Sequence, residues 1–556
     1  MRRSPLLPVL LAAALVLPSP AVAQTAPSAE EPPLFGEVID VRVVNVEVVV
    51  TDRSGQRVQA LKPGDFRLKV DGKEVPVSYF TEVREGVSTA PAASAAADSD
   101  AGPEETAGLV DPGTAVATSY LVFIDDYFSI DFHRNEVLQA LKSDLSRLGP
   151  QDRMAIVAWD GGRIALLSNW TGTPGQLAKA LDTAMRRPAR GFDRLTESMS
   201  FQNDRSFSNQ VLDEDRLMDV SATNVGLSLQ ELAYGQTLSR QIEGAVSAVV
   251  GTLRAFADPP GRKVMLLLSG GWPFSIQGFL SPDRGAAPSR QVREGEDLMR
   301  PLTSTANLLG YTIYPVDVPG VQTLAADARL ASPVEASSVR EQEIEGTLEF
   351  LAQETGGKPL RNSNRLVALA EASADTRSYY WLGFTPTWKH NDKRHKVVVD
   401  VLRPGLRARS RTGFLDLSKK AEVSMRLESA LRFGSLPGAI PMPLKLGAVA
   451  PGKRKMTLEI PLTLGLPVDL LTIVPVDGKF AAQVELRFAA SAENGNTSEI
   501  PVIPLTLKSD KAPKAGGFVR YETKITLRGD ANHLVIALYD PVSGKFATAE
   551  SDIQRP

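Results

Sequence analysis

From Ser119 onward the chain alternates short apolar runs with amphipathic helical segments, and this alternation constrains the fold more than any other feature. The apolar runs are YLVFID, RMAIVAWD, KVMLLLSGG and YTIYPVD. The segments between them, such as FHRNEVLQALKSDLSRLG, repeat apolar residues at helical spacing. Strands that alternate with helices predict a mostly parallel sheet with helices on both faces. We therefore expect an α/β core over residues 119–415, with a polar insertion at 188–222.

The two ends of the chain show the period-2 alternation of antiparallel strands. Residues 34–86 contain VIDVRVVNVEVVVTD and DFRLKVDGKEVPVSYF, which predict an N-terminal β-sandwich-like module. Residues 421–556 contain further strand-like runs broken by Pro and Gly, which predict a C-terminal β-sandwich domain. The runs SYYWLGFTP and KVVVDVLRPGL are expected to close the α/β core as an edge hairpin. Residues 87–118, rich in Ala, Ser, Gly and Pro, cannot bury enough apolar surface to order themselves and predict a disordered linker.

The first residues, MRRSPLLPVLLAAALVLPSPAVAQ, have the three parts of a secretory signal peptide with cleavage after Ala23. The apolar part is too short to span a bilayer, and no other run is long enough. We therefore expect residues 1–23 to be removed, the mature chain to lack a transmembrane segment, and the protein to be periplasmic or extracellular. Removal of Arg2 and Arg3 changes the formal net charge from -3 to -5.

Composition and motifs exclude several functional classes. The acidic balance argues against a nucleic-acid partner, which requires a clustered basic surface. The absence of cysteine excludes disulfides, thiol catalysis and cysteine-based zinc sites. The four histidines lack the i, i+4 helical pairing of zinc hydrolases, and no phosphate-binding or nucleophile motif follows a strand. The chain is therefore not expected to be an enzyme, and an exported hydrolase is the least favoured reading.

The run YLVFIDDYFS carries the most distinctive candidate site, because Asp125, Asp126 and Ser129 follow directly after an apolar strand. Ser269 and Asp317 end two other predicted strands, and the carboxyl ends of parallel strands meet at one edge of a sheet. These side chains offer only oxygen ligands, so Mg²⁺ or Ca²⁺ is the cofactor that such a site would take. The favoured alternative is structural, with the carboxylates capping the following helix and hydrogen-bonding the loop.

Several longer segments resemble the bacterial VWFA-related (Acidobacterial-type) domain proteins, whose core is a von Willebrand factor type A fold. The matching segments are VVVTDRSGQRVQALKPGDFRLKVDGKEVPVSYF, YLVFIDD, GRKVMLLLSGG, LGYTIYPVD, LAQETGG, SYYWLGFTP and RHKVVVDVLRPGLRARSRTGF. The resemblance covers most of residues 40–415. It implies a Rossmann-like type A core, flanked here by the two β-sandwich modules, in an exported binding or scaffold protein.

In the type A fold a divalent cation is held by a D-x-S-x-S loop, a threonine and a second aspartate. The resemblance places the leading aspartate at Asp125 and the second serine at Ser129. It also places Tyr127 where the first serine stands, and Gly270 where the second aspartate stands. The threonine falls at Thr223, with Thr196 as a competitor.

The resemblance therefore implies a degenerate metal-ion-dependent adhesion site with Asp125, Ser129 and Thr223 as metal ligands, and the adjacent Asp126 offers a further carboxylate that could compensate for a lost ligand. Tyr127, Ser269, Gly270 and Asp317 would lie along the same ligand edge.

The function expected from these observations is that of an exported, non-enzymatic adhesion-type or scaffold protein that binds a protein or cell-envelope partner. The alternative is a metal-free spacer that separates the two β-sandwiches within an envelope assembly. The loss of the second aspartate at Gly270 favours the spacer, whereas the retained Asp125 and Ser129 favour a cation-dependent binder.

Overall fold

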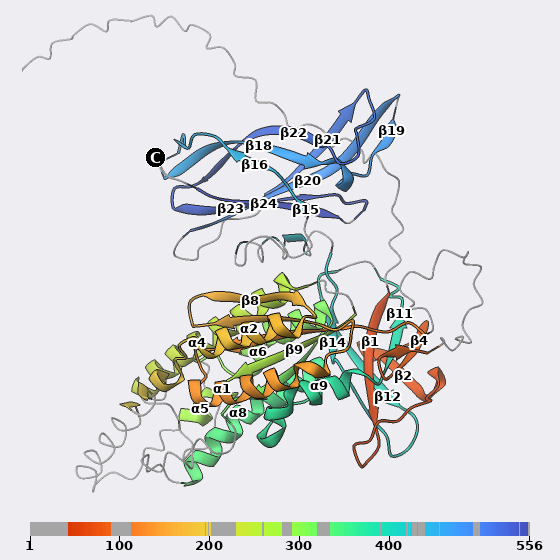
Figure 1. The fold of residues 1–556 in the computed structure, drawn as a ribbon, viewed down its shortest axis with the longest axis vertical. Coiled ribbons are helices and arrows are strands. Elements are labelled where there is room, and N and C mark those ends of the chain that lie inside the picture. Colours follow the sequence, from red (N-terminus) through yellow and green to blue (C-terminus); the bar gives the residue numbers. More distant parts are fainter. Residues whose placement is uncertain are drawn as a thin grey trace, which may run out of the picture. The chain divides into compact units, whose positions relative to one another are not determined.

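The computed structural model describes residues 43–553, apart from 90–112, 202–228, 258–260, 281–291, 320–333, 389–390, most of 419–439, 493–500 and a few single positions. The predicted signal peptide and most of the predicted linker lie outside the described residues. Figure 1 shows the described elements, which form five β-sheets and a set of helices. None of the helices in the described ranges is long and apolar enough to cross a membrane.

Two antiparallel sheets form the N-terminal sandwich, and they combine strands of the N-terminal segment with strands from the C-terminal end of the expected α/β core. One sheet has the order β13-β1-β11-β4-β5 and the other β14-β12-β2-β3. Their strands are β1 (Val44–Thr51), β2 (Phe66–Val70), β3 (Lys73–Val75), β4 (Tyr79–Arg84), β5 (Val87–Ser88), β11 (Tyr379–Phe384), β12 (Arg394–Val401), β13 (Arg407–Ser410) and β14 (Gly413–Leu415).

The expectation of an edge hairpin over SYYWLGFTP and KVVVDVLRPGL was therefore wrong. β11 lies between β1 and β4, and β12 lies between β14 and β2, so these strands complete the N-terminal sandwich. The physical reason is side-chain burial: Tyr380 and Leu382 of β11 pack with Phe66 and Phe80 in one apolar cluster. The predicted linker also has an ordered start, because β5 pairs with β4.

The central sheet has the order β10-β9-β6-β7-β8. Its strands are β6 (Thr118–Asp125), β7 (Arg153–Trp159), β8 (Ile164–Thr171), β9 (Arg262–Ser269) and β10 (Tyr311–Asp317). β6 runs parallel to β7 and β9, and β9 runs parallel to β10. β8 is antiparallel to β7, because the two strands are joined by a tight turn in which the Asp160 N–H donates to the Arg163 carbonyl.

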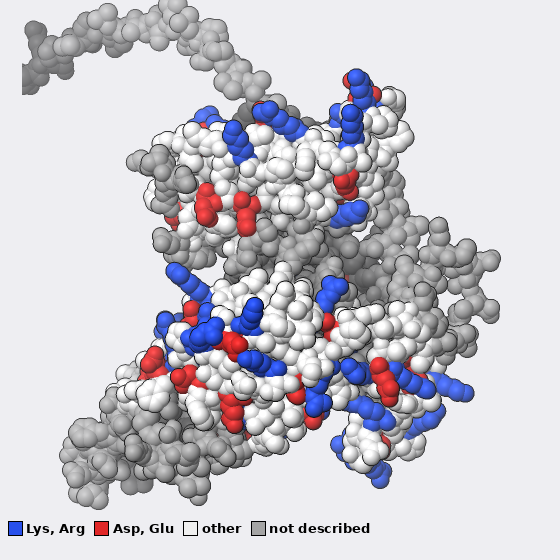
Figure 2. Space-filling model, in the orientation of Figure 1, with Lys and Arg blue, Asp and Glu red and all other residues white. Residues whose placement is uncertain are grey.

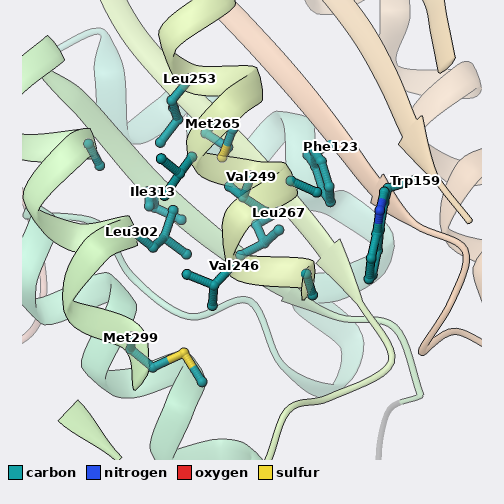
Figure 3. Packing of buried hydrophobic residues seen from close by; sticks show 14 of the residues in the cluster. Phe123, Trp159, Val246, Val249, Leu253, Met265, Leu267, Met299, Leu302 and Ile313 are labelled. Atoms are coloured by element: carbon teal, nitrogen blue, oxygen red, sulfur yellow. The ribbon is translucent and has the colours of Figure 1, made fainter. Parts of the chain in front are cut away.

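Helices cover both faces of the central sheet, and every residue of β6 is buried. Along β6 the side chains alternate between two apolar clusters: Leu121 and Phe123 belong to one, Tyr120 and Val122 to the other. Figure 3 shows the first cluster, in which Val246 and Val249 of α4 pack toward Phe123 and Leu267. The described helices are α1 (Asp131–Ser143), α2 (Pro174–Met185), α4 (Leu229–Ala255), α5 (Ile276–Leu280), α6 (Glu296–Leu309), α8 (Val334–Thr355) and α9 (Ala368–Thr376).

The C-terminal region forms a second pair of sheets. One has the order β15-β24-β23-β20-β19 with β21 paired to β20, and the other β16-β18-β17 with β22 paired to β18. The longer strands are β18 (Thr457–Pro467), β20 (Lys479–Ala492), β21 (Val502–Ser509), β22 (Phe518–Arg528), β23 (Ala531–Tyr539) and β24 (Phe546–Asp552). The shorter strands are β15 (Ile440–Pro441), β16 (Leu444–Leu446), β17 (Ala450–Pro451) and β19 (Val474–Val476).

The predicted fold class, a protein built around a Rossmann-like type A core with a mostly parallel sheet, is overturned. Strands make up 40% of the structure and helices 31%, the sheets are mixed or antiparallel, and most of the chain is β-sandwich-like. The central sheet is itself mixed, and no clear Rossmann-like parallel core stands out. The alternation of strands and helices led to the assignment of residues 379–415 to the central domain. The strands in that range belong to the N-terminal sandwich instead.

Candidate functional site

The loop Asp125–Ser129 lies at the carboxyl edge of the central sheet. β6 ends at Asp125, and the Asp126 N–H donates to the Trp159 carbonyl at 2.8 Å, which ties the loop to the end of β7. In the neighbouring strands Ser269 and Asp317 occupy paired positions at the ends of β9 and β10. Asp125, Ser269 and Asp317 therefore share one edge, as parallel pairing requires.

Asp125 is fully buried, and both of its carboxylate oxygens accept hydrogen bonds from the protein. Oδ1 accepts from the backbone N–H groups of Tyr127 and Phe128, both at 3.1 Å. Oδ2 accepts from Ser269 Oγ at 2.8 Å and from Trp272 Nε1 at 2.9 Å. Four donors thus occupy the directions in which a carboxylate accepts hydrogen bonds.

Burial dominates the acidity of Asp125 and raises its pKa to about 6, although these hydrogen bonds favour the charged form and act in the opposite direction. The interactions of Asp125 lie within its own loop, at the strand end at Ser269 and in the turn that follows, at Trp272. The carboxylate does not cap the next helix: α1 has its N-cap at Ile130, and no side chain caps it.

Asp126 is also fully buried, and it points to a different set of partners from Asp125. Its Oδ1 accepts from Arg134 Nη1 at 2.7 Å, and its Oδ2 accepts from Arg187 Nε at 2.7 Å. Arg134 is itself fully buried and donates through Nη2 to the Arg187 carbonyl at 2.9 Å. Burial raises the pKa of Asp126, while the two guanidinium groups oppose that change. The three side chains form an ion network in which Asp126 and Arg134 are fully buried and Arg187 is partly exposed.

The first residues after Arg187 cover the loop from outside. The Arg190 N–H donates to the Asp126 carbonyl at 2.8 Å, and the Gly191 N–H donates to the Ser129 carbonyl at 2.9 Å. A Cβ at position 191 would lie 2.4 Å from the carbonyl carbon of Ser129, so only glycine permits this approach. The start of the predicted insertion is therefore part of the site.

Ser129 is fully buried, and its Oγ has no hydrogen-bond partner within the described chain. This oxygen is the one feature of the loop that suits an additional ligand, since buried polar atoms are normally paired with protein or water.

Tyr127 and Gly270 occupy the positions where the resemblance implies a serine and an aspartate. The Tyr127 ring packs against Phe128 and Trp159, and the Arg194 guanidinium lies 5.4 Å from its centroid. A Cβ at position 270 would lie 1.8 Å from the Phe128 carbonyl oxygen. Tyr127 is therefore a packing residue here, and this backbone leaves no room for an aspartate at position 270.

The remaining candidates are Thr223, Thr196 and Asp317. Thr223 lies outside the described residues. Thr196 is exposed and its Oγ1 donates to the Phe192 carbonyl at 3.0 Å within its own helix. Asp317 is half-buried at the end of β10, where its N–H donates to the Leu360 carbonyl at 3.0 Å.

The oxygen atoms at this loop do not fit a hard divalent cation, which requires six or more oxygen ligands. The oxygens of Asp125 already accept from neutral N–H and O–H donors, and those of Asp126 face two positively charged guanidinium groups. A cation would have to displace four hydrogen bonds or approach Arg134 and Arg187 against their charge. Among the described residues, no group of three or more His, Asp or Glu side chains is placed to hold a metal ion.

Three residues that complete this arrangement were missed at the level of sequence: Arg134, Arg187 and Trp272. A signal existed for Arg134, because it lies three residues before Val137 on the apolar stripe of the predicted helix. An arginine on a buried stripe requires a buried acid, and Asp126 precedes it by eight residues. Arg187 and Trp272 carry no such signal, because their positions depend on how the segments fold back onto the loop.

No protein-family model and no curated protein matches this sequence. Among solved structures the chain is similar to the crystal structure of bovine butyrophilin, with 7% identity, a TM-score of 0.12 and coverage of 32% of this chain and 64% of that one. It is also similar to the crystal structure of the pilus adhesin SpaC from Lactobacillus rhamnosus GG, with 8% identity, a TM-score of 0.20 and coverage of 79% and 54%. The chain thus spans less than two thirds of either protein, and likenesses this slight carry no argument about fold or function.

Proposed function

We propose that this chain is a metal-independent, non-enzymatic binding or scaffold protein, in which the loop Asp125–Ser129 holds the sheet edge together instead of capturing a cation. The observation that carries the proposal is the full set of protein donors around the two carboxylates. Four donors surround Asp125, and Arg134 and Arg187 neutralise Asp126. Both acids therefore have structural partners that a metal would have to displace.

The surroundings of Ser269 support a non-enzymatic role. Its hydroxyl donates to Asp125, and its side chain is 3% exposed, so a substrate would not reach it. A serine nucleophile also needs a base that is itself oriented by a third group. Here the serine donates directly to the carboxylate without an intervening imidazole.

The loop edge also supports a protein partner. Phe132, in the first turn of α1, is 71% exposed, and Phe192, next to Gly191, is 67% exposed. Phe132 lies three residues after Ser129, and Phe192 follows Gly191, whose N–H donates to the Ser129 carbonyl. Exposed aromatic side chains are enriched in protein–protein interfaces. Figure 2 shows Lys and Arg interspersed with Asp and Glu over the visible described surface, which is unlike the basic stripe of a nucleic-acid binder.

The export of the chain remains a prediction from its first 23 residues, and its family remains a prediction from the matching segments. A periplasmic or extracellular location and a cell-envelope partner belong to the same proposal.

Thermal unfolding of the full chain in EDTA, Mg²⁺ and Ca²⁺ tests metal independence. We expect the same midpoint in all three solutions, and an equal fall in all three for Asp125→Ala. A cation that bound only the native state at 100 times its dissociation constant would add about 2.7 kcal/mol to the free energy of unfolding. A metal-dependent rise that Asp125→Ala abolishes would overturn the proposal.

A further inference from the structure

A cavity of about 520 Å³ lies far from the loop, where β1 of the N-terminal sandwich meets the amino end of β9 and the turn between α6 and β10. Its walls mix apolar side chains with charged ones. The residues that matter for its chemistry are Glu47, Arg262, Asn307, Trp381, Arg411 and Phe414. The volume lies within the range of small-molecule pockets, which are usually apolar with a few placed polar groups.

Arg262 is the most deeply buried charged group that lines the cavity, with 1% of its surface exposed. Its Nε lies 3.1 Å from Glu47 Oε2, and its guanidinium lies 4.2 Å from the ring centroid of Tyr379. Its Nη1 has no hydrogen-bond partner within the described chain. A buried guanidinium with an unused donor beside a cavity is unusual, because buried polar groups are normally paired.

Arg411 lines the same cavity and also keeps an unused donor. Its Nη1 donates to the Asn307 carbonyl at 2.8 Å and its Nη2 donates to the Asn45 carbonyl. Those two bonds fix the guanidinium, while its buried Nε has no partner within the described residues. The side-chain oxygen of Asn307 is likewise buried and unpaired there. Two fixed guanidinium groups therefore share one cavity, and each has hydrogen-bonding capacity left for a ligand.

The charge of the lining selects a monoanion. Arg262, Lys263 and Arg411 contribute three positive charges, and Glu47 and Asp416 contribute two negative ones, which leaves a net charge of one. Guanidinium groups match the planar geometry of a carboxylate, and Glu47 would repel a dianion such as phosphate.

The apolar part of the lining selects the body of the ligand. Val44, Trp381 and Phe414 line the same cavity and offer aliphatic and aromatic surface. We propose that this cavity binds a small amphipathic carboxylate, with the carboxylate on Arg262 and Arg411 and a short apolar body against these three side chains. This binding site does not depend on the loop Asp125–Ser129 or on the function proposed for it.

Calorimetric titration of the full chain with hexanoate tests the site, with three other compounds as comparisons. Hexanamide has the same apolar body without the charge, acetate has the charge without the body, and inorganic phosphate is mostly a dianion when all four titrations are run at pH 8. We expect hexanoate to bind at least tenfold more tightly than each of them. Equal binding of hexanoate and hexanamide, tighter binding of phosphate, or no binding of hexanoate would overturn the proposal.

Two substitutions in the cavity have opposite expected effects, so a loss of folding cannot mimic both. Arg411→Gln should weaken hexanoate binding at least tenfold, because it removes one cation. Glu47→Gln should tighten binding several-fold, because it removes the carboxylate that competes for Arg262. Arg520→Gln, on the exposed face of β22, is the matched control and should leave the dissociation constant unchanged. Weaker binding in Glu47→Gln, or unchanged binding in a folded Arg411→Gln variant, would place hexanoate elsewhere.

Discussion

Ser269 donates a hydrogen bond of 2.8 Å from its Oγ to Oδ2 of Asp125, and this bond joins the carboxyl ends of β9 and β6. The two residues are 144 positions apart in sequence, and both are buried. Trp272 donates to the same oxygen, so the strand end and the turn after it converge on one carboxylate. The sheet edge at which the sequence predicted a cation site is closed here by side chains of the protein itself.

Replacement of Ser269 by alanine should destabilise the protein by about 1–3 kcal/mol, because it leaves a buried carboxylate with one hydrogen bond fewer. Urea unfolding at pH 7 measures the change. Ser54→Ala is the matched control, since Ser54 Oγ donates to Asp52 Oδ1 at 2.7 Å on the exposed surface. That control should change the free energy of unfolding by less than about 0.5 kcal/mol. Equal effects of the two substitutions would show that the bond to Asp125 has no special weight.

The pH dependence of stability should reflect the titration of Asp125. Burial raises the pKa of this carboxyl group from 3.8 to about 6. The unfolded chain has the ordinary pKa, so between about pH 4 and pH 6 the folded protein keeps a proton that the unfolded chain has lost. Stability from this group is therefore present below pH 4 and is lost as the pH rises through 6. A shift of about two pKa units corresponds to about 3 kcal/mol.

Asp125→Asn removes the titrating group and keeps the shape of the side chain, so it isolates this contribution. Urea unfolding at pH 4, 5, 6 and 7 should show that the wild-type protein loses stability relative to the variant as the pH rises. The subtraction cancels the titration of the histidines and of the other acids. Parallel stability curves for the two proteins would mean that Asp125 has an ordinary pKa.

The ion network of Asp126 should be strongly coupled. Asp126→Ala leaves the fully buried Arg134 without its carboxylate, and removal of one partner of such a pair costs about 3–5 kcal/mol. Arg134→Met in the same background should restore part of that loss, because an apolar side chain then replaces the unpaired charge. A double-mutant cycle measured by urea unfolding gives the coupling energy.

An exposed pair on α6 serves as the comparison for this cycle. Arg300 Nη2 lies 2.9 Å from Glu296 Oε2, and both side chains are about half exposed. Exposed pairs at i, i+4 contribute less than about 1 kcal/mol. If the Asp126–Arg134 cycle gives a coupling energy as small as that of Glu296–Arg300, the network does not hold the loop in place.

The sequence was a reliable guide where a pattern reports on local structure. The alternation of apolar residues located β6, β7, β9 and β10, because this pattern depends on neighbouring residues alone. Pairing between distant segments was not accessible in this way. A half-buried strand such as β11 has the same pattern at the edge of a central sheet as in the middle of a sandwich, and only the shared cluster with Phe66 and Phe80 decides between them.

The candidate site shows the same division. Adjacent carboxylates after a strand were correctly placed in a loop at the sheet edge, but their partners determine what they do. Trp272 and Arg187 reach them from segments far along the chain, and no spacing rule predicts such contacts. The departure at Gly270 was visible in the sequence, whereas its steric cause, the Phe128 carbonyl, was not.

Restoring the aspartate at position 270 should therefore fail to create a cation site. A Cβ there would lie 1.8 Å from the Phe128 carbonyl oxygen, so both Gly270→Ala and Gly270→Asp must displace the loop and should lower stability by several kcal/mol, on the order of 2–4. Gly175→Ala in the first turn of α2 is the matched control, because nothing lies within 4 Å of its Cβ and alanine favours the helix. Thermal unfolding in EDTA, Mg²⁺ and Ca²⁺ should show no metal-dependent stabilisation of Gly270→Asp. A stable Gly270→Asp protein whose midpoint rises with Mg²⁺ would show that the loop opens readily to a ligand and that the hydrogen bonds around Asp125 do not keep it closed.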